Sequence, residues 1–294
     1  MKLAVCLKEV IDSTLPLRVS PRKGEITQQS GSEPIRLINP ADRAALEVAM
    51  QLAGQGTNSN VEAFSVCPPE ATSVLHFALA RGASNAERIP PLENASGPPA
   101  TALALAQRFS GENFDAICCG DETLDNSAAA VGPLLAELLD LPVVSGVLQV
   151  RSATAGDKAV LERRLERGYR EVVETRLPAV LTLTQDAAEP RYVSMGRLRR
   201  AQQREVPVWT PGEADAPQNL PGWPDQEKTV APRARVKKKF IPDSSMGGTD
   251  RMKMLMGDMG SSQSQSDSQD TILEGDAEYL SQQLFRFLKH HEFI

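Results

Sequence analysis

The sequence predicts a doubly wound α/β fold with a mainly parallel sheet. Short apolar runs alternate with longer amphipathic segments over residues 1–150, and each run is bounded by Gly, Pro, Asn or charged residues. The runs are apolar throughout, as strands buried on both faces should be. At 294 residues, the chain has room for one α/β core and an appendage. We therefore expect an α/β domain over residues 1–210, an extended and partly disordered arm over 211–270, and a helical end over 271–294.

Strands and helices are predicted to alternate along the first half of the chain. We expect strands at residues 3–7, 61–66, 86–89, 115–119 and 143–150. We expect helices at residues 40–52, 70–81, 99–109 and 127–139. Asn39 caps the first helix, and Pro40 suits its first turn.

The spacing of apolar residues changes after residue 150. Residues 159–165 and 172–176, with a Gly-containing turn between them, predict an antiparallel hairpin, and residues 179–184 predict another buried strand. Residues 243–270 are a mixture of Ser, Gln, Gly and Met without apolar periodicity, which is typical of an arm. Leu280, Leu284 and Leu288 then share one helix face, and this terminal helix should contact its own domain or another subunit.

Composition argues against several classes of function. The formal net charge is −6 and the basic residues are scattered, so nucleic acid is not an expected partner. The first apolar run is too short for a signal peptide or a membrane span, which favours a cytoplasmic protein without membrane insertion. The four cysteines lack metal-type spacing with histidines, so no metal site is predicted. The sequence has three histidines and lacks GxSxG, Walker, HExxH and GxGxxG motifs, which argues against self-contained catalysis.

The segment that says most about function follows the strand predicted at residues 115–119. A polar loop over residues 120–126 leads into a helix that we expect to begin at Ser127 with three alanines. Backbone N–H groups at a helix start bind phosphate, and small side chains allow its close approach. The loop also lies at the carboxyl end of a strand, where ligands bind in doubly wound folds. Taken alone, it can equally be an ordinary βα loop, with Asp121, Glu122 and Asp125 exposed to water.

Residues 163–182 carry a family resemblance. They read RRLERGYREVV at residues 163–173 and LPAVLT at 177–182, and their spacing of Arg, Glu, Gly, Glu, Val, Pro and Thr resembles the signature of electron transfer flavoprotein beta subunits. Further segments in the family order are LAVCLKEVID at 3–12, LINPADRAALEVAM at 37–50, CGDETLDNSAAAVG at 119–132 and EPRYVSM at 189–195. The resemblance covers residues 1–210 and departs from the signature at Leu161 and Arg167.

The resemblance implies a non-catalytic subunit of a heterodimer. Its partner, an alpha subunit, would hold most of the FAD, and the pair would carry electrons from dehydrogenases to a quinone-linked oxidoreductase or another acceptor. Met195, in a predicted loop, matches an exposed Leu that docks the partner dehydrogenases. The rival hypothesis is a stand-alone adenine-nucleotide-binding protein or ATP-dependent enzyme of the adenine-nucleotide α-hydrolase-like fold, which has the same sheet architecture.

The resemblance also implies a nucleotide pocket. The matching positions for the adenosine are Cys6, Asn39, Asp42 and Val66, and those around the phosphate are Gly120, Asp121, Asp125, Asn126, Ser127, Ala128, Ala129, Ala130, Val131 and Gly132. Ala129, Ala130 and Val131 stand where the AMP-binding pattern has polar Asn, Gln and Thr, so only backbone donors remain there. AMP, a second FAD and an empty pocket therefore all stay open.

Overall fold

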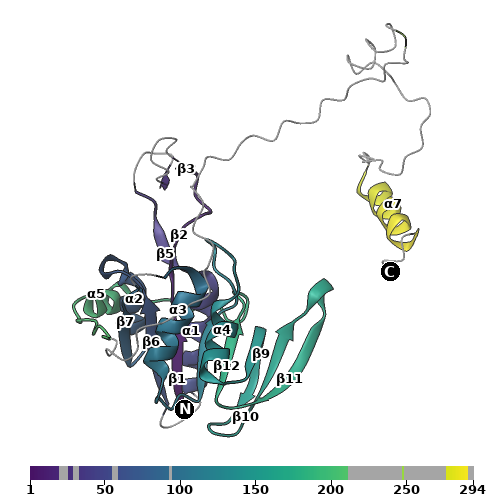
Figure 1. Cartoon of the computed structure of the whole chain (residues 1–294). Helices are drawn as coiled ribbons and strands as arrows, with labels where there is room; N and C mark the ends of the chain where they lie inside the picture. Colours follow the sequence, from purple (N-terminus) through teal and green to yellow (C-terminus); the bar gives the residue numbers. More distant parts are fainter. Residues whose placement is uncertain are drawn as a thin grey trace. The chain divides into compact units, whose positions relative to one another are not determined.

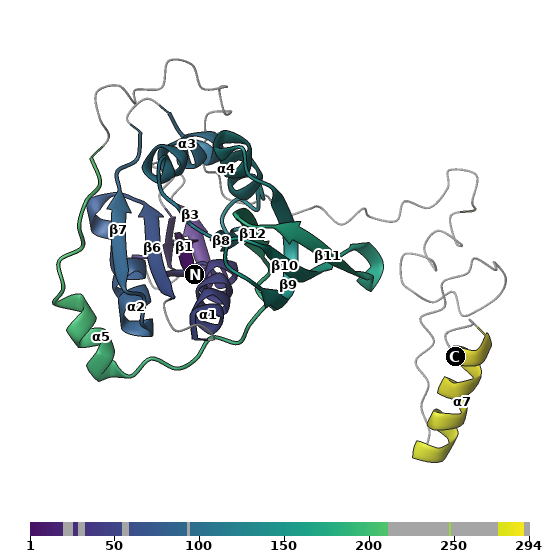
Figure 2. The same ribbon diagram turned by 90° about the horizontal axis from the view of Figure 1, so that it is seen from below.

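The computed structural model describes residues 1–19, 26–28, 33–54, 59–92, 95–210, 247 and 276–290. Its central element is an eight-stranded sheet with helices on both faces (Figures 1 and 2). The strands of this sheet are β1 (Lys2–Cys6), β6 (Asn60–Val66), β7 (Asn85–Ile89), β8 (Ala116–Gly120), β9 (Val143–Ala153), β10 (Lys158–Arg164), β11 (Arg170–Arg176) and β12 (Ala179–Leu183).

The order across the sheet is β11-β10-β9-β12-β8-β1-β6-β7. Neighbouring strands from β9 to β7 are parallel, whereas β10 is antiparallel to both β9 and β11. The predicted mainly parallel sheet and its antiparallel hairpin are therefore confirmed. Pairing of β10 with β9 extends the hairpin into a three-stranded antiparallel part at one side of the sheet.

The helices form one layer on each face of the sheet (Figure 2). Helices α1 (Pro40–Gly54) and α2 (Ser73–Arg81) cover one face, and α3 (Gly97–Phe109) and α4 (Val131–Leu139) cover the other. Strand β1 explains the apolar runs, because Leu3 and Val5 pack in the core under α1 and α2, while Ala4 and Cys6 pack in the core under α3 and α4. Successive side chains of a strand point to opposite faces, so a strand covered on both must be apolar at every position.

The chain changes direction across the sheet between β1 and β8. After β1 it moves outward through β6 and β7, and it then returns to place β8 on the other side of β1. The connections before and after this reversal run over opposite faces, so the carboxyl ends of β1 and β8 open into a crevice. This crevice is the topological switch point of a doubly wound sheet.

The predicted helix start at Ser127 is wrong, because α4 begins at Val131. Ser127 and Ala129 have left-handed backbone angles, with φ of 46° and 49°, which cannot continue an α-helix. Both the backbone N–H and the hydroxyl of Ser127 donate to the carbonyl oxygen of Thr123, at 2.9 and 3.1 Å. These bonds close a turn before the helix, so residues 127–130 belong to the loop.

Several short elements were not predicted. Helix α5 (Met195–Gln202) occupies a stretch expected to be a loop, so Met195 is the first residue of a helix. Two small antiparallel pairs join β2 (Glu9–Ile11) to β5 (Arg36–Ile38) and β3 (Leu17–Val19) to β4 (Ile26–Gln28). A short 3₁₀ turn, Pro69–Ala71, replaces the first turn predicted for α2.

Helix α7 (Ala277–His290) is observed where a terminal helix was predicted, and it belongs to the second of the two compact units of the chain. Its Leu284 and Phe285 are exposed, and Leu280 is half-buried. The arm expected at 211–270 lies outside the described residues, apart from Gly247. Among the helices that the structure describes, none combines the length and apolar character needed to cross a bilayer.

Candidate functional site

A pocket of about 310 Å³ lies at the switch point between β1 and β8. Cys6, Leu7 and Lys8, at the end of β1, form one wall. The loop between β8 and α4 forms the opposite wall, and Gly97 and Pro98, at the first turn of α3, close a third side. Small-molecule sites in open α/β sheets lie in such crevices at the carboxyl ends of strands.

Most of the residues predicted from the sequence line this pocket. They are Cys6, Asp42, Val66, Gly120, Asp121, Asp125, Asn126, Ala128, Ala129, Ala130 and Val131. Asn39 and Ser127 instead line a smaller neighbouring cavity on the other side of the loop. Gly132 packs against β12, where an added Cβ would collide with Cγ2 of Thr182.

The first turn of α1 holds the two diverging strands together. Asp42, which is buried, accepts a backbone hydrogen bond from Lys8 at 2.8 Å and another from Gly120 at 2.9 Å. Asn39 donates to the carbonyl oxygen of Glu122 at 2.9 Å and accepts from the N–H of Leu124 at 3.3 Å. Asp42 therefore fixes the strand ends, and Asn39 fixes the loop that follows β8.

Backbone amides supply the donors of the loop wall. The left-handed Ala129 is followed by Ala130 in the right-handed region (φ −107°, ψ −23°), and such alternation turns successive N–H groups toward one concavity, which binds anions. Within the described part of the chain, no acceptor pairs with the N–H groups of Ala129, Ala130 or Val131. The unpaired N–H groups that were predicted for a helix start therefore belong to the loop.

Lys8 is the cation of the pocket, and the sequence analysis missed it. Its Nζ lies 2.5 Å from Oδ2 of Asp125, and the hydroxyl of Thr123 donates to the other oxygen at 2.6 Å. Partial burial raises the pKa of Asp125, but these two hydrogen bonds outweigh burial and leave the pKa below its usual value. Asp121 and Glu122 also line the pocket, so its rim carries more acidic than basic side chains. The described residues show no cluster of acidic, His or Cys side chains suited to a metal.

Asp42 should make stability depend on pH. Burial raises its pKa from 3.8 to about 7, against hydrogen bonds from Asn39, Lys8 and Gly120 that lower it. Because the folded chain holds this proton more tightly than the unfolded chain, stability should fall as pH rises from about 4 to 7, by at most ~1.4 kcal/mol per pH unit. Thermal unfolding of native and Asp42→Asn heterodimers across this range should show the slope only in the native protein, and equal slopes would contradict it.

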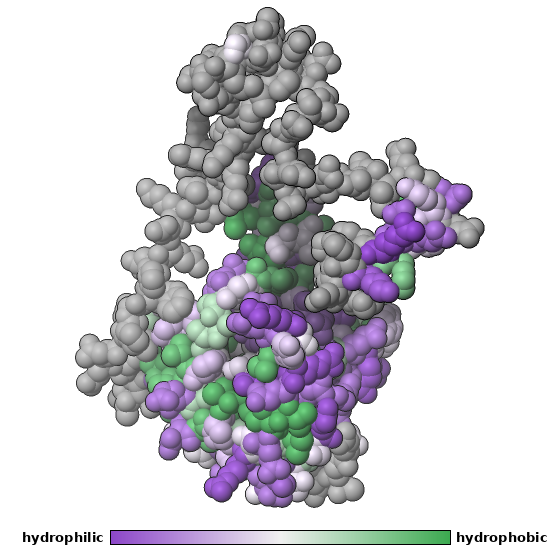
Figure 3. All heavy atoms as spheres, turned by 90° about the vertical axis from the view of Figure 1, so that its right-hand side faces the viewer, coloured by the Kyte–Doolittle hydropathy of each residue, from purple (hydrophilic) through white to green (hydrophobic). Residues whose placement is uncertain are grey.

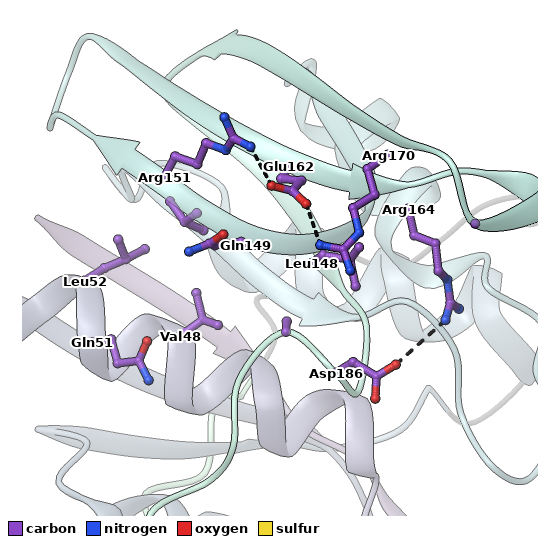
Figure 4. A pocket seen from close by; sticks show the side chains of 13 residues that line it. Val48, Gln51, Leu52, Leu148, Gln149, Arg151, Glu162, Arg164, Arg170 and Asp186 are labelled. Atoms are coloured by element: carbon purple, nitrogen blue, oxygen red, sulfur yellow. Dashed lines mark hydrogen bonds and ion pairs between the residues drawn. The ribbon is translucent and has the colours of Figure 1, made fainter. Parts of the chain in front are cut away.

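A larger groove, of about 870 Å³, lies away from the switch point (Figure 4). Its walls are α1 and the three-stranded antiparallel part of the sheet, and it shares no lining residue with the switch-point pocket. Glu162 accepts from Arg151 at 2.7 Å and from Arg170 at 2.9 Å, which neutralises its charge within the groove. Asp186, the other carboxylate of the groove, lies 3.8 Å from Arg164, so each described carboxylate that lines the groove has a cationic partner.

Two of the described surfaces that expose apolar side chains lie at opposite edges of the sheet. Beside the hairpin, Tyr169 and Val172 are exposed, and the side of the molecule where β11 forms the sheet edge shows apolar surface between polar side chains (Figure 3). On the opposite edge, Tyr192 is 86 % exposed and Met195 is 57 % exposed, where the chain enters α5. Exposed apolar clusters are typical of protein contacts.

Comparison with known proteins identifies relatives of one family. Residues 35–214 match the model of the electron transfer flavoprotein domain. The electron transfer flavoprotein subunit beta of Clostridium acetobutylicum is 34 % identical over 218 residues, covering 73 % of this chain and 80 % of the relative. Protein FixA of Azorhizobium caulinodans is 35 % identical over 257 residues, covering 83 % and 89 %. Subunit CarD of the caffeyl-CoA reductase-Etf complex of Acetobacterium woodii is 30 % identical over 213 residues, covering 71 % and 78 %.

Proposed function

Because this chain belongs to the electron transfer flavoprotein family and has the electron-transfer role of its beta subunit, we propose that it is the non-catalytic half of a heterodimer. An alpha subunit holds most of the FAD, and the pair carries electrons from a dehydrogenase to a quinone-linked or other acceptor. The four cysteines are free and buried, which suits a reducing cytoplasm. As part of this proposal, we assign the α/β domain to the adenine-nucleotide α-hydrolase-like fold.

The switch-point pocket is the observation that carries this proposal, and it fits an adenosine phosphate. Val66, which is half-buried, provides apolar surface for a flat base, and the buried side chains of Phe64 and Leu105 pack behind this wall of the pocket. Ala129, Ala130 and Val131 also line the pocket, and their N–H groups, which have no protein acceptors among the described residues, suit a phosphate. The ligand is AMP or the adenylate half of a second FAD: AMP supports the fold as a bound nucleotide, and FAD supplies a further redox centre.

Release of bound nucleotides tests this proposal. The heterodimer is purified, denatured and chromatographed, and we expect either one FAD with one AMP or two FAD per pair. Ala129→Asp places a carboxylate among the N–H donors at a left-handed position that Asp tolerates, so it should remove the second nucleotide. Ala155→Asp, in the exposed turn between β9 and β10, adds the same charge and should change nothing. One FAD with no adenylate in the native pair contradicts the filled pocket.

Met195 is proposed to dock the dehydrogenase. Met195→Ala should lower kcat/KM for a reduced flavin-dependent dehydrogenase about tenfold, as expected for a central interface side chain, while the flavin content stays unchanged. Stopped-flow reduction of the heterodimer by a panel of such dehydrogenases, each reduced by its own substrate, measures the effect. Leu138→Ala removes a similarly exposed side chain from α4 and serves as the control. Equal rates for native and Met195→Ala proteins would refute docking through this residue.

A further inference from the structure

A buried carboxylate lies beneath the exposed segment at residues 191–195. Glu47 is on α1, among the apolar core residues of that helix, and its exposed fraction is 0 %. It forms an ion pair with the guanidinium of Arg81, the last residue of α2, which is also buried. Its two oxygens also accept from Arg191: Nε donates to Oε1 at 2.6 Å, and the backbone N–H donates to Oε2 at 3.3 Å.

Both ends of the exposed segment are attached to the Glu47–Arg81 pair. Arg191, which binds Glu47, lies directly before Tyr192. At the other end, Nη2 of Arg197 donates to the carbonyl oxygen of Arg81 at 3.3 Å. Arg81 thus takes part at both ends, through its guanidinium and Glu47 at one end and through its carbonyl oxygen at the other. Between these attachments, Tyr192 and Met195 project from the surface.

The start of α5 adds a further restraint on the direction of Met195. Ser194 caps the helix, and its Oγ accepts from the backbone N–H of Arg197 at 3.4 Å. The far end of α5 is attached to α2, because Nε2 of His76 lies 3.2 Å from the carbonyl oxygen of Arg204. Figure 2 shows α5 running beside α2 at the edge of the sheet. A capped and packed helix fixes the backbone from which Met195 projects.

The surroundings of Glu47 are rich in positive charge. Burial, together with the guanidiniums of Arg191, Arg43 and Arg197, lowers the pKa of Arg81 to about 10. Cations this close repel one another unless a carboxylate lies between them. Glu47 supplies that carboxylate between the guanidiniums of Arg81 and Arg191.

We propose that Glu47 is the positioning residue of the docking segment: with Arg81, it holds Arg191 and Arg197 so that Tyr192 and Met195 face the dehydrogenase in a fixed arrangement. This inference rests on the proposed docking function of Met195. It adds the requirement that the segment be held rigidly, and not only that Met195 be exposed. A segment released from Glu47 would spend less time in the arrangement that binds the dehydrogenase.

The test removes the contact to the segment and leaves the buried pair in place. Arg191→Met keeps the aliphatic stem but loses the guanidinium, while Glu47 still pairs with Arg81. Arg199→Met is the matched control. Arg199 is exposed like Arg191, but it lies on α5 and makes no described contact with Glu47. Both variants are made in the full heterodimer, and hydrogen–deuterium exchange is followed in peptides covering residues 189–196, together with kcat and KM for the dehydrogenase that reduces the native complex.

We expect Arg191→Met to speed exchange in residues 189–196 about tenfold, as for loss of one charge-assisted hydrogen bond, while Arg199→Met leaves exchange unchanged. KM for the dehydrogenase should rise about tenfold with kcat preserved, and Arg191→Lys should restore part of both effects. Unchanged exchange in Arg191→Met overturns the positioning role. Faster exchange without a change in KM also overturns it if Met195→Ala does raise KM. If neither Arg191→Met nor Met195→Ala alters KM, the proposed docking function of Met195 is wrong instead.

Discussion

Replacing Glu47 with alanine should lower the free energy of unfolding by about 3–5 kcal/mol, because it leaves the buried guanidinium of Arg81 without its carboxylate. An isolated buried charge cannot recover the hydration that it loses on folding. In the native chain Arg81 has a pKa of about 10 and is charged at neutral pH, and Glu47 is the carboxylate that balances this charge. Thermal unfolding of the purified heterodimer measures the loss.

A double variant separates the loss of charge balance from the loss of volume. Glu47→Leu with Arg81→Met replaces the buried pair by apolar side chains of similar size, which is often neutral or stabilising. We expect this double variant to recover most of the stability lost in Glu47→Ala. It should nevertheless show fast exchange in residues 189–196, because Arg191 has lost its carboxylate. A double variant as unstable as Glu47→Ala would show that packing, and not the unpaired charge, determines the effect.

The sheet was predictable because burial on both faces leaves a direct mark on the sequence. In β1, Leu3 to Cys6 are all buried, and a run of that length bounded by polar residues is readable without neighbours. The hairpin of β10 and β11 was equally readable from its flanking residues and its central Gly168. The pairs β2 with β5 and β3 with β4 were not, because strands of three residues are too short to show a period.

The loop proposed to bind phosphate was predicted to begin a helix at Ser127, and the structure gives it a different backbone. Alanines at 128–130 favour a helix by local propensity, and the hydrogen bonds from Ser127 to Thr123 override that preference with a turn. Propensity is a weak guide where a side chain closes a competing local bond. The donors expected of a helix start are nonetheless present, because left-handed residues can turn N–H groups toward an anion as well.

The cluster of Glu47, Arg81 and Arg191 was not predicted, because its members are far apart in sequence. Glu47, Arg81 and Arg191 come from α1, from the end of α2 and from the segment before α5, so no motif joins them. One signal was available: Glu47 lies next to Leu46 and Val48 in a helix whose neighbouring positions are apolar. A charged residue inside such a stretch requires a buried partner, although the sequence does not say which.

Gly120→Ala should have the second large effect, and it acts directly on the switch-point pocket. A Cβ at this position would collide with Oδ1 of Asp42 and lie 2.9 Å from Cβ of Ala41 and 3.0 Å from the backbone nitrogen of Asp42. The first turn of α1 would have to move away from the end of β8, which breaks the bond from the N–H of Gly120 to Asp42. Overpacking and the lost buried hydrogen bond together should cost about 2–5 kcal/mol.

The same displacement should also empty the pocket, because Asp42 joins the ends of β1 and β8 that form its walls. We expect the purified Gly120→Ala heterodimer to unfold at a lower temperature and to release less adenylate on denaturation than the native protein. Gly54→Ala is the control: an added Cβ there meets nothing within 4 Å, so stability and nucleotide content should stay as in the native protein. Native adenylate content and an unchanged unfolding temperature in Gly120→Ala would mean that close approach of α1 to β8 does not maintain the pocket.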